Sequence, residues 1–147
     1  MRTSGRRAGQ RFDAQYGVTT EALVFLHDLN AELLGSSLAQ ATHYEPTPPR
    51  DFAAFMHALP VDFGKSAFVD IGSGMGRVVL LAARHPFKQI VGIELSPALH
   101  EIAAANLKRW VDPQQRCKDI RLVCADASTF DFPAGNLVVY LYNPFRR

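Results

Sequence analysis

The sequence of 147 residues lacks several features that mark whole classes of protein. No apolar run reaches the roughly 18 residues that a membrane-spanning helix needs, and the first ten residues contain no apolar stretch like that of a secretory signal. The two cysteines, Cys117 and Cys124, are too few for a zinc site of the usual spacing, and the five histidines form no His-x-x-x-His pair. The sequence therefore predicts a cytoplasmic protein that neither enters a membrane nor holds a metal.

The sequence also has little excess charge. Its 16 basic and 14 acidic residues leave a net charge of +2, which by itself is too little to indicate a nucleic-acid partner. Positive charge is nevertheless concentrated near the N-terminus, at Arg2, Arg6, Arg7 and Arg11. We expect residues 1–18 to form a basic flexible tail, which gives only weak support to nucleic acid as a partner.

Residues 19–60 have the pattern of an N-terminal helical cap. A first helix is expected to begin at Thr19 or Thr20, and a second is expected to be capped by Thr47 and ended by Pro60. The apolar stripe of the second helix consists of Phe52, Phe55, Met56 and Leu59.

Residues 61–147 alternate between short apolar runs and amphipathic segments, which is typical of a parallel sheet with crossover helices. Strands are predicted at residues 67–71, 89–94, 120–124 and 137–142, and helices at 77–84 and 97–110. Right-handed crossovers then give the strand order 3-2-1-4. The fold class is therefore α/β, a partial doubly wound (Rossmann-like) parallel sheet preceded by N-terminal helices.

The strongest chemical signal is a glycine-rich turn between the first strand and its helix, with glycines at 72, 74 and 76. Glycines allow positive φ angles and close approach of the backbone to a ligand. A dinucleotide fingerprint reads G-x-G-x-x-G, and here the third glycine comes one residue early, which argues against NAD. The carboxylate of Asp70 would repel a pyrophosphate but suits the ammonium of an amino-acid cofactor, and S-adenosylmethionine carries that group.

The segment from Val69 to Gly76 resembles motif I of the class I S-adenosylmethionine-dependent methyltransferases, and the resemblance extends over about residues 44–145. It implies S-adenosylmethionine as the cofactor and a methyltransferase activity. The residues of motif I that the resemblance assigns to cofactor binding are Asp70, Gly72, Ser73, Gly74 and Gly76.

Two later motifs follow in the order of that family. The resemblance implies that Glu94, with Leu95 beside it, holds the ribose hydroxyls, and that Asp126 and the backbone N–H of Ala127 bind the adenine. The alternatives are a solvated charge at the strand end for Glu94 and an ordinary turn-forming role for Asp126.

The fourth strand leads into Asn143-Pro144-Phe145, which resembles the Asn-Pro-Pro-aromatic motif of methyltransferases that act on amino nitrogens, with one proline missing. The resemblance implies catalytic roles for two residues. The carbonyl of Asn143 would accept hydrogens from the target amine, and Phe145 would pack against the target. An Asn-Pro turn that leaves a strand is the alternative.

The cofactor site is also similar to that of histone lysine methyltransferases that lack a SET domain, through a Tyr-x-x-Thr segment at Tyr44 and Thr47. That similarity implies a loop closing over the methionine end of the cofactor, whereas Thr47 as a helix cap is the alternative. The expected function is methyl transfer to a nitrogen of a protein lysine, an amide or a small molecule. A non-catalytic cofactor-binding remnant is the alternative.

The fourth strand also bears on whether residues 61–147 form a complete domain. Its core, Leu137 to Leu141, is continuously apolar, yet the order 3-2-1-4 places it at an edge of the sheet. By resemblance the family's sheet has seven strands and this sequence supplies four. We therefore expect residues 61–147 to be incomplete at the C-terminus and to self-associate through this edge.

Overall fold

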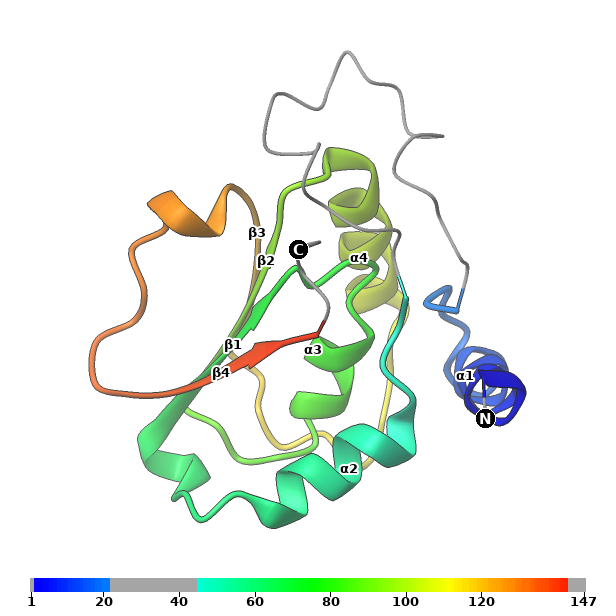
Figure 1. The fold of residues 1–147 in the computed structure, drawn as a ribbon, viewed down its shortest axis with the longest axis horizontal. Coiled ribbons are helices and arrows are strands. Elements are labelled where there is room, and N and C mark those ends of the chain that lie inside the picture. The colour runs from blue at the N-terminus through cyan, green and yellow to red at the C-terminus, as the bar shows by residue number, and fades with distance from the viewer. Residues whose placement is uncertain (1, 22–44, 143–147) are drawn as a thin grey trace.

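The computed structural model describes residues 2–21 and 45–142, and its centre is an all-parallel sheet of four strands in the order β3-β2-β1-β4 (Figure 1). The strands are β1 (Ser66–Ile71), β2 (Gln89–Glu94), β3 (Ile120–Cys124) and β4 (Asn136–Leu141). The predicted α/β class and strand order are confirmed. The bounds of β2 and β3 agree with the prediction, and β1 and β4 each begin one residue earlier.

The helices are α1 (Arg2–Tyr16), α2 (Pro49–Ala58), α3 (Arg77–Ala82) and α4 (Pro97–Arg109), with single 3-10 turns η4 (Phe63–Lys65) and η5 (Ala127–Thr129). The side chain of Ser96 caps α4 by accepting from the N–H of Leu99. Helix α3 ends two residues earlier than predicted, because the N–H groups of Arg84 and His85 turn back to the carbonyls three residues before them. Within the described residues, no helix is long and apolar enough to cross a membrane.

Aromatic side chains fill one face of the sheet. The ring centroid of Phe52 on α2 lies 5.9 Å from that of Phe68 on β1 and 5.7 Å from that of Tyr140 on β4, and both pairs of rings are T-shaped. Phe55 and Leu59 pack against the same core, which confirms the apolar stripe predicted for this helix. On the opposite face, Val69, Val91 and Ile93 form a second, smaller cluster, which Phe130 partly covers.

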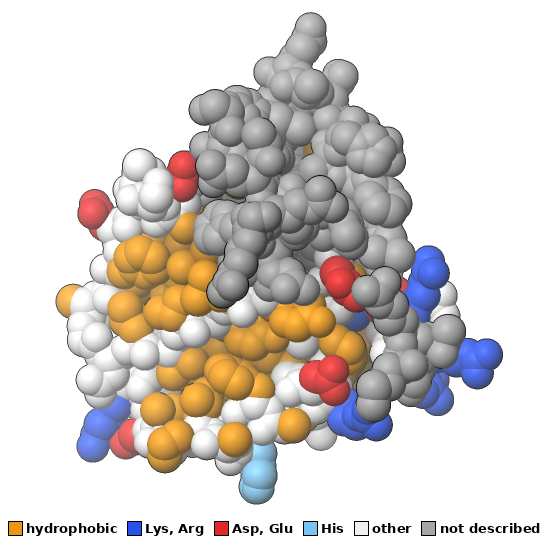
Figure 2. Space-filling view, viewed as in Figure 1, with side chains coloured by type: hydrophobic (Ala, Val, Ile, Leu, Met, Phe, Trp, Pro, Cys, Tyr) orange, Lys and Arg blue, Asp and Glu red, His pale blue; other side chains and the backbone are white. Residues whose placement is uncertain are grey.

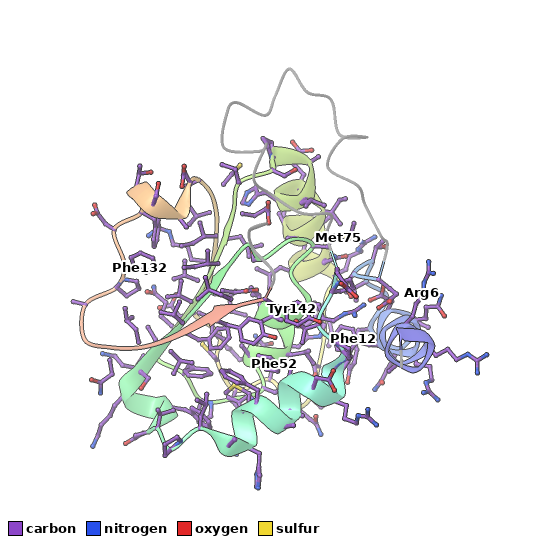
Figure 3. The ribbon with its side chains drawn as sticks, viewed as in Figure 1. Arg6, Phe12, Phe52, Met75, Phe132 and Tyr142 are labelled. Carbon is purple, nitrogen blue, oxygen red and sulfur yellow. The ribbon has the colours of Figure 1, made fainter. Side chains whose placement is uncertain are left out.

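The prediction of a flexible tail at the N-terminus is wrong, because residues 2–16 form helix α1. The helix packs against the rest of the protein through the buried residues Gly9 and Phe12, and Gly17 follows its end at φ 64°. Figure 3 shows Phe12 on the side of α1 that faces the molecule, with Arg6 away from it. The many arginines of this segment correctly predicted that it is exposed to solvent. They did not predict that one side of the helix packs against the rest of the protein.

The predicted cap at Thr47 is also wrong. Pro48 occupies the N-cap position of α2 and no side chain caps the helix there. Instead the buried hydroxyl of Thr47 pairs with the hydroxyl of Tyr140 at 2.9 Å. The predicted helix beginning at Thr19 or Thr20 falls almost wholly on residues 22–44, outside the described residues.

Candidate functional site

The glycine-rich turn leaves the carboxyl end of β1 and is fastened to the end of β2. Its three glycines have φ angles of 76°, 54° and 91°, which only glycine adopts readily. The N–H groups of Gly72 and Ser73 both donate to the carbonyl of Ile93, at 2.9 and 3.0 Å. The turn is therefore held against β2 at the sheet edge where open α/β folds bind their ligands.

Gly92 of β2 is part of this arrangement, and sequence reasoning did not select it. A Cβ atom at Gly92 would lie 2.8 Å from a methyl group of Val79 and 3.0 Å from Oγ of Ser73. Such distances are too short, so the absence of a side chain at this position lets α3 and the turn lie close to β2. A glycine inside an otherwise apolar strand was the available signal.

Glu94 links the ends of two loops through its carboxylate. Oε2 accepts from the N–H of Gly74 at 2.7 Å, and Oε1 accepts from the N–H of Ser96 at 2.8 Å. Burial raises the pKa of Glu94, and these backbone hydrogen bonds oppose that rise. The side chain is buried, so the alternative of a solvated charge is wrong. The backbone N–H of Leu95 also lowers the pKa of this carboxylate, and since a carboxylate has about four lone-pair sites, acceptor capacity remains for a ligand hydroxyl.

Asp70 is a buried acid, and no cation lies beside it within residues 2–21 and 45–142. Burial and the nearby charge of Glu94 raise its pKa to about 8, so the carboxyl holds its proton at neutral pH. From the part of the chain that the structure describes, no group donates a hydrogen bond to this carboxyl. A ligand ammonium would supply both the missing donor and the missing charge, and the residues present therefore fit an amino-acid cofactor.

Asp126 and Ala127 follow β3 at the same edge of the sheet. The end of β3 lies beside Glu94, which is paired in register with Cys124, and Leu95 is the next residue. A side-chain oxygen of Asp126 caps η5 by accepting from the N–H of Ser128 at 2.9 Å. This is the turn-forming role that the sequence offered as an alternative, and the adenine contact stays a prediction.

Three predicted site residues, Tyr44, Asn143 and Phe145, lie outside the described residues. Thr47 lies close to the turn without belonging to it, since its carbonyl accepts from a guanidinium N–H of Arg77, the residue that follows the last glycine. The structure thus brings together Asp70, the glycine-rich turn and Glu94. It places Leu95, Asp126 and Ala127 along the same edge.

Asn106 is a further residue of the site that sequence reasoning missed. Its side chain is fully buried and donates to the carbonyl of Met75, in the middle of the turn, at 2.9 Å. Its position on α4 lies three residues after the buried Ala103, among the apolar residues that face the sheet. A polar residue within an apolar stripe was the signal that could have identified it.

Comparison with known proteins gives a family match over this region. A family described as "Methyltransferase domain" matches residues 68–145, which is more than half of the chain. The tRNA (guanine-N(7)-)-methyltransferase of Lactobacillus gasseri is 31% identical over 81 residues, which are 54% of this chain and 32% of that protein. The trans-aconitate 2-methyltransferase of Methylobacterium radiotolerans is 35% identical over 69 residues, 46% of this chain and 26% of that protein. The chain therefore spans a third or less of these curated relatives.

Solved structures show the same similarity. An RNA methyltransferase from Salinibacter ruber, in complex with S-adenosylhomocysteine, superposes with a TM-score of 0.51 at 29% identity, over 66% of this chain and 61% of that one. A protein-L-isoaspartate O-methyltransferase superposes with a TM-score of 0.52 at 24% identity, over 66% of this chain and 30% of that one. The second likeness is evidence for the fold alone.

Proposed function

The chain belongs to the methyltransferase domain family, and we propose that it binds S-adenosylmethionine and transfers the methyl group to a nitrogen atom of its substrate. The observation that carries this proposal is the pair of buried acids. Among the described residues no cation lies beside Asp70, and Glu94 keeps acceptor capacity for a ligand. Together they match an ammonium and the neighbouring hydroxyls of one ligand.

The cofactor, when bound, supplies an activated methyl group with a good leaving group, so the protein has to bind and orient rather than provide a nucleophile. We assign the ammonium to Asp70, the ribose hydroxyls to Glu94 and the adenine to Asp126 and Ala127. The positive φ angles of Gly72 and Gly74 favour glycine, and neither residue therefore has a side chain that could project from the turn. Orientation of this kind can be worth an effective molarity of about 10⁵ to 10⁸ M.

The acceptor side rests on Asn143 and Phe145. The amide carbonyl of Asn143 would accept hydrogens from a target amine and align its lone pair with the methyl group, while Phe145 packs against the target. A lysine amine has a reference pKa near 10.4 and has to lose a proton before it attacks, and an amide such as Asn143 cannot act as the base. A neutral amide or ring nitrogen needs only alignment.

The proposed function is tested by transfer of a labelled methyl group. The protein is incubated with S-adenosylmethionine carrying a tritiated methyl group and with fractions of a cell extract, and the labelled product is then analysed for its N-methyl linkage. We expect Asn143→Ala to lower transfer while affinity for S-adenosylhomocysteine stays the same. Tight cofactor binding without transfer to any fraction would favour the alternative of a non-catalytic binding remnant.

One observation favours RNA as a second candidate acceptor. Arg6, Arg7 and Arg11 are exposed on α1, and Figure 2 shows basic side chains gathered on the side of the molecule where α1 lies. Exposed arginines on a fixed helix are suited to phosphate contacts. The relatives include a tRNA methyltransferase and an RNA methyltransferase.

This second candidate has its own test. The double variant Arg7→Ala/Arg11→Ala should weaken binding to total tRNA and reduce the salt dependence of that binding, because each lost phosphate contact lowers the slope by about one unit. Arg121→Ala on β3, which is also exposed, is the matched control. Equal tRNA affinity in both variants would rule out α1 as an RNA-binding surface.

A further inference from the structure

Helix α1 and the residues that follow it are tied to the glycine-rich turn by two fully buried polar side chains, Arg77 and Asn106. We propose that these ties make α1 part of the cofactor-binding unit, with Arg77, Asn106 and Glu21 as positioning residues that hold the turn in its ligand-binding shape. This inference rests on the proposed function. It adds that affinity for S-adenosylmethionine depends on a helix more than 50 residues away in sequence.

Arg77 is the first residue of α3 and directly follows the last glycine of the turn. Its guanidinium lies 2.7 Å from the Glu21 carboxylate and 3.7 Å from that of Asp13, and its Nε donates to the hydroxyl of Thr20 at 2.8 Å. Another guanidinium N–H reaches the carbonyl of Thr47. At the end of the turn, this one arginine therefore contacts α1, residues 20–21 and the backbone just before α2.

Asp13, near the end of α1, holds residues 20–21 in place beside Arg77. Its carboxylate accepts from the N–H groups of Thr20 and Glu21, at 2.7 and 2.9 Å, and from the hydroxyl of Thr20. These contacts fix the backbone that presents Glu21 to Arg77. The acids are thus placed by α1 rather than by the sheet.

Asn106 makes the second tie from α4. Its amide exchanges two hydrogen bonds with the backbone of Thr19, at 2.9 and 2.8 Å, and also donates to the carbonyl of Met75. The same amide group thus bonds to the turn and to the segment after α1. Figure 3 shows Met75 between α4 and the α1 side of the molecule.

Gly9 lets α1 lie against the ion pair. A Cβ atom at this position would fall 1.6 Å from Oε2 of Glu21 and 2.6 Å from a guanidinium nitrogen of Arg77. The same helix carries a second glycine, Gly5, whose added Cβ would lie 3.1 Å from Cγ of Pro48 and, among the described side chains, near no charged group. The two glycines differ in what they face.

Displacement of Glu21 would reach the turn because a buried charge cannot remain without its partner. Arg77 would move to recover a partner, and its backbone is continuous with Gly76, which sits at φ 91° with its Cα hydrogens against Ala103. A turn strained away from this shape offers the cofactor a poorer fit. By linkage, cofactor binding also strengthens the docking of α1 to the same degree.

The test compares Gly9→Ala with Gly5→Ala, two substitutions of one kind in one helix, neither of which touches the cofactor site. We expect Gly9→Ala to raise the Kd for S-adenosylhomocysteine by about tenfold, within the usual range of coupling between sites, and Gly5→Ala to leave it unchanged. In the unmodified protein, the ligand should slow hydrogen exchange of the α1 amides. Equal Kd values for the two variants would overturn the inference.

A second pair of variants covers the case in which Gly9→Ala does not fold. Arg84 also forms a 2.7 Å ion pair, with Asp112, and its guanidinium donates to Tyr16 of α1, but at the end of α3 remote from the turn. Arg77→Lys should weaken ligand binding at a temperature where both proteins are folded, and Arg84→Lys should not. Equal affinities would overturn the inference, whereas failure of the unmodified protein to bind the ligand would overturn the proposed function and this inference with it.

Discussion

The backbone N–H of Gly74 donates to Oε2 of Glu94 at 2.7 Å, although the two residues are 20 positions apart in the sequence. The acid assigned to the ribose therefore also fastens the turn assigned to the methionine end of the cofactor. Because Ser96 donates to the other oxygen, the carboxylate is oriented before any ligand arrives. Binding and turn geometry are thus parts of one arrangement.

The replacement Glu94→Gln should weaken both ligand binding and the attachment of the glycine-rich turn to Glu94. One carboxylate oxygen becomes an NH₂ group that faces a backbone N–H donor, and an unsatisfied buried group costs about 1–3 kcal/mol. We expect a lower melting temperature and a Kd for S-adenosylhomocysteine raised at least about tenfold, a change of about 1.4 kcal/mol. Glu101→Gln, on the exposed side of α4, is the control. An unchanged Kd in Glu94→Gln would exclude the ribose role.

Asp70 should make stability depend on pH in an unusual direction. Its pKa is raised from 3.8 to about 8 in the folded protein, so its contribution to the free energy of unfolding is fully present below about pH 4 and is lost as pH rises toward 8. The difference in free energy of unfolding between the unmodified protein and Asp70→Asn, measured with urea without ligand, should therefore fall across this window. A difference that rises with pH would show that the pKa of Asp70 is lowered instead.

The same group should release a proton when the cofactor binds. At pH 7 the ligand's amino group is charged, and its arrival beside Asp70 lowers the pKa of the carboxyl. Calorimetry in phosphate and in Tris should thus give binding enthalpies that differ according to the ionisation heats of the buffers. Asp70→Asn should show no such difference, and a buffer-independent enthalpy in the unmodified protein would contradict the ammonium assignment.

Gly92→Ala tests the close packing of the turn on β2. The new methyl group would meet Val79, Leu122 and Ser73 at 2.8 to 3.0 Å, and overpacking of this kind costs about 1–3 kcal/mol. Gly64→Ala is the control, because its Cβ would meet its nearest atom at an ordinary 3.4 Å. We expect urea denaturation to show a lower free energy of unfolding for Gly92→Ala and an unchanged one for Gly64→Ala. Equal stability of the two variants would mean that the turn can move away from β2 at no cost.

Self-association through β4 stays a prediction, and the structure defines the residues to change. Leu137, Val139 and Leu141 are 37%, 40% and 51% exposed on one face of this edge strand, and Figure 2 shows a broad apolar surface over this region. We expect a second copy to pair with the strand, and Val139→Lys to abolish the concentration-dependent mass in sedimentation equilibrium. Val61→Lys, at a residue 38% exposed and far from β4 in sequence, should not. A monomer at all concentrations would rule out the pairing.

The sequence predicted the sheet well because its signals are local. The apolar run that β2 occupies ends at an acid, and the order of the strands follows from the handedness of their connections. The ties to α1 are different, since Arg77 bonds to Thr20 across 57 positions and Asn106 to Thr19 across 87. In the sequence, Gly9 falls in the segment predicted to be a flexible tail, and Arg77 is only the first residue of a predicted helix. Their roles depend on a contact that only the folded chain creates.

The central claim is that the turn and its two acids bind S-adenosylmethionine, and calorimetry with S-adenosylhomocysteine and with NAD tests it most directly. The account predicts saturable binding of one S-adenosylhomocysteine per chain, weakened in Glu94→Ala, and no heat of binding with NAD. Binding of NAD, or S-adenosylhomocysteine affinity that is the same in Glu94→Ala as in the unmodified protein, would contradict it.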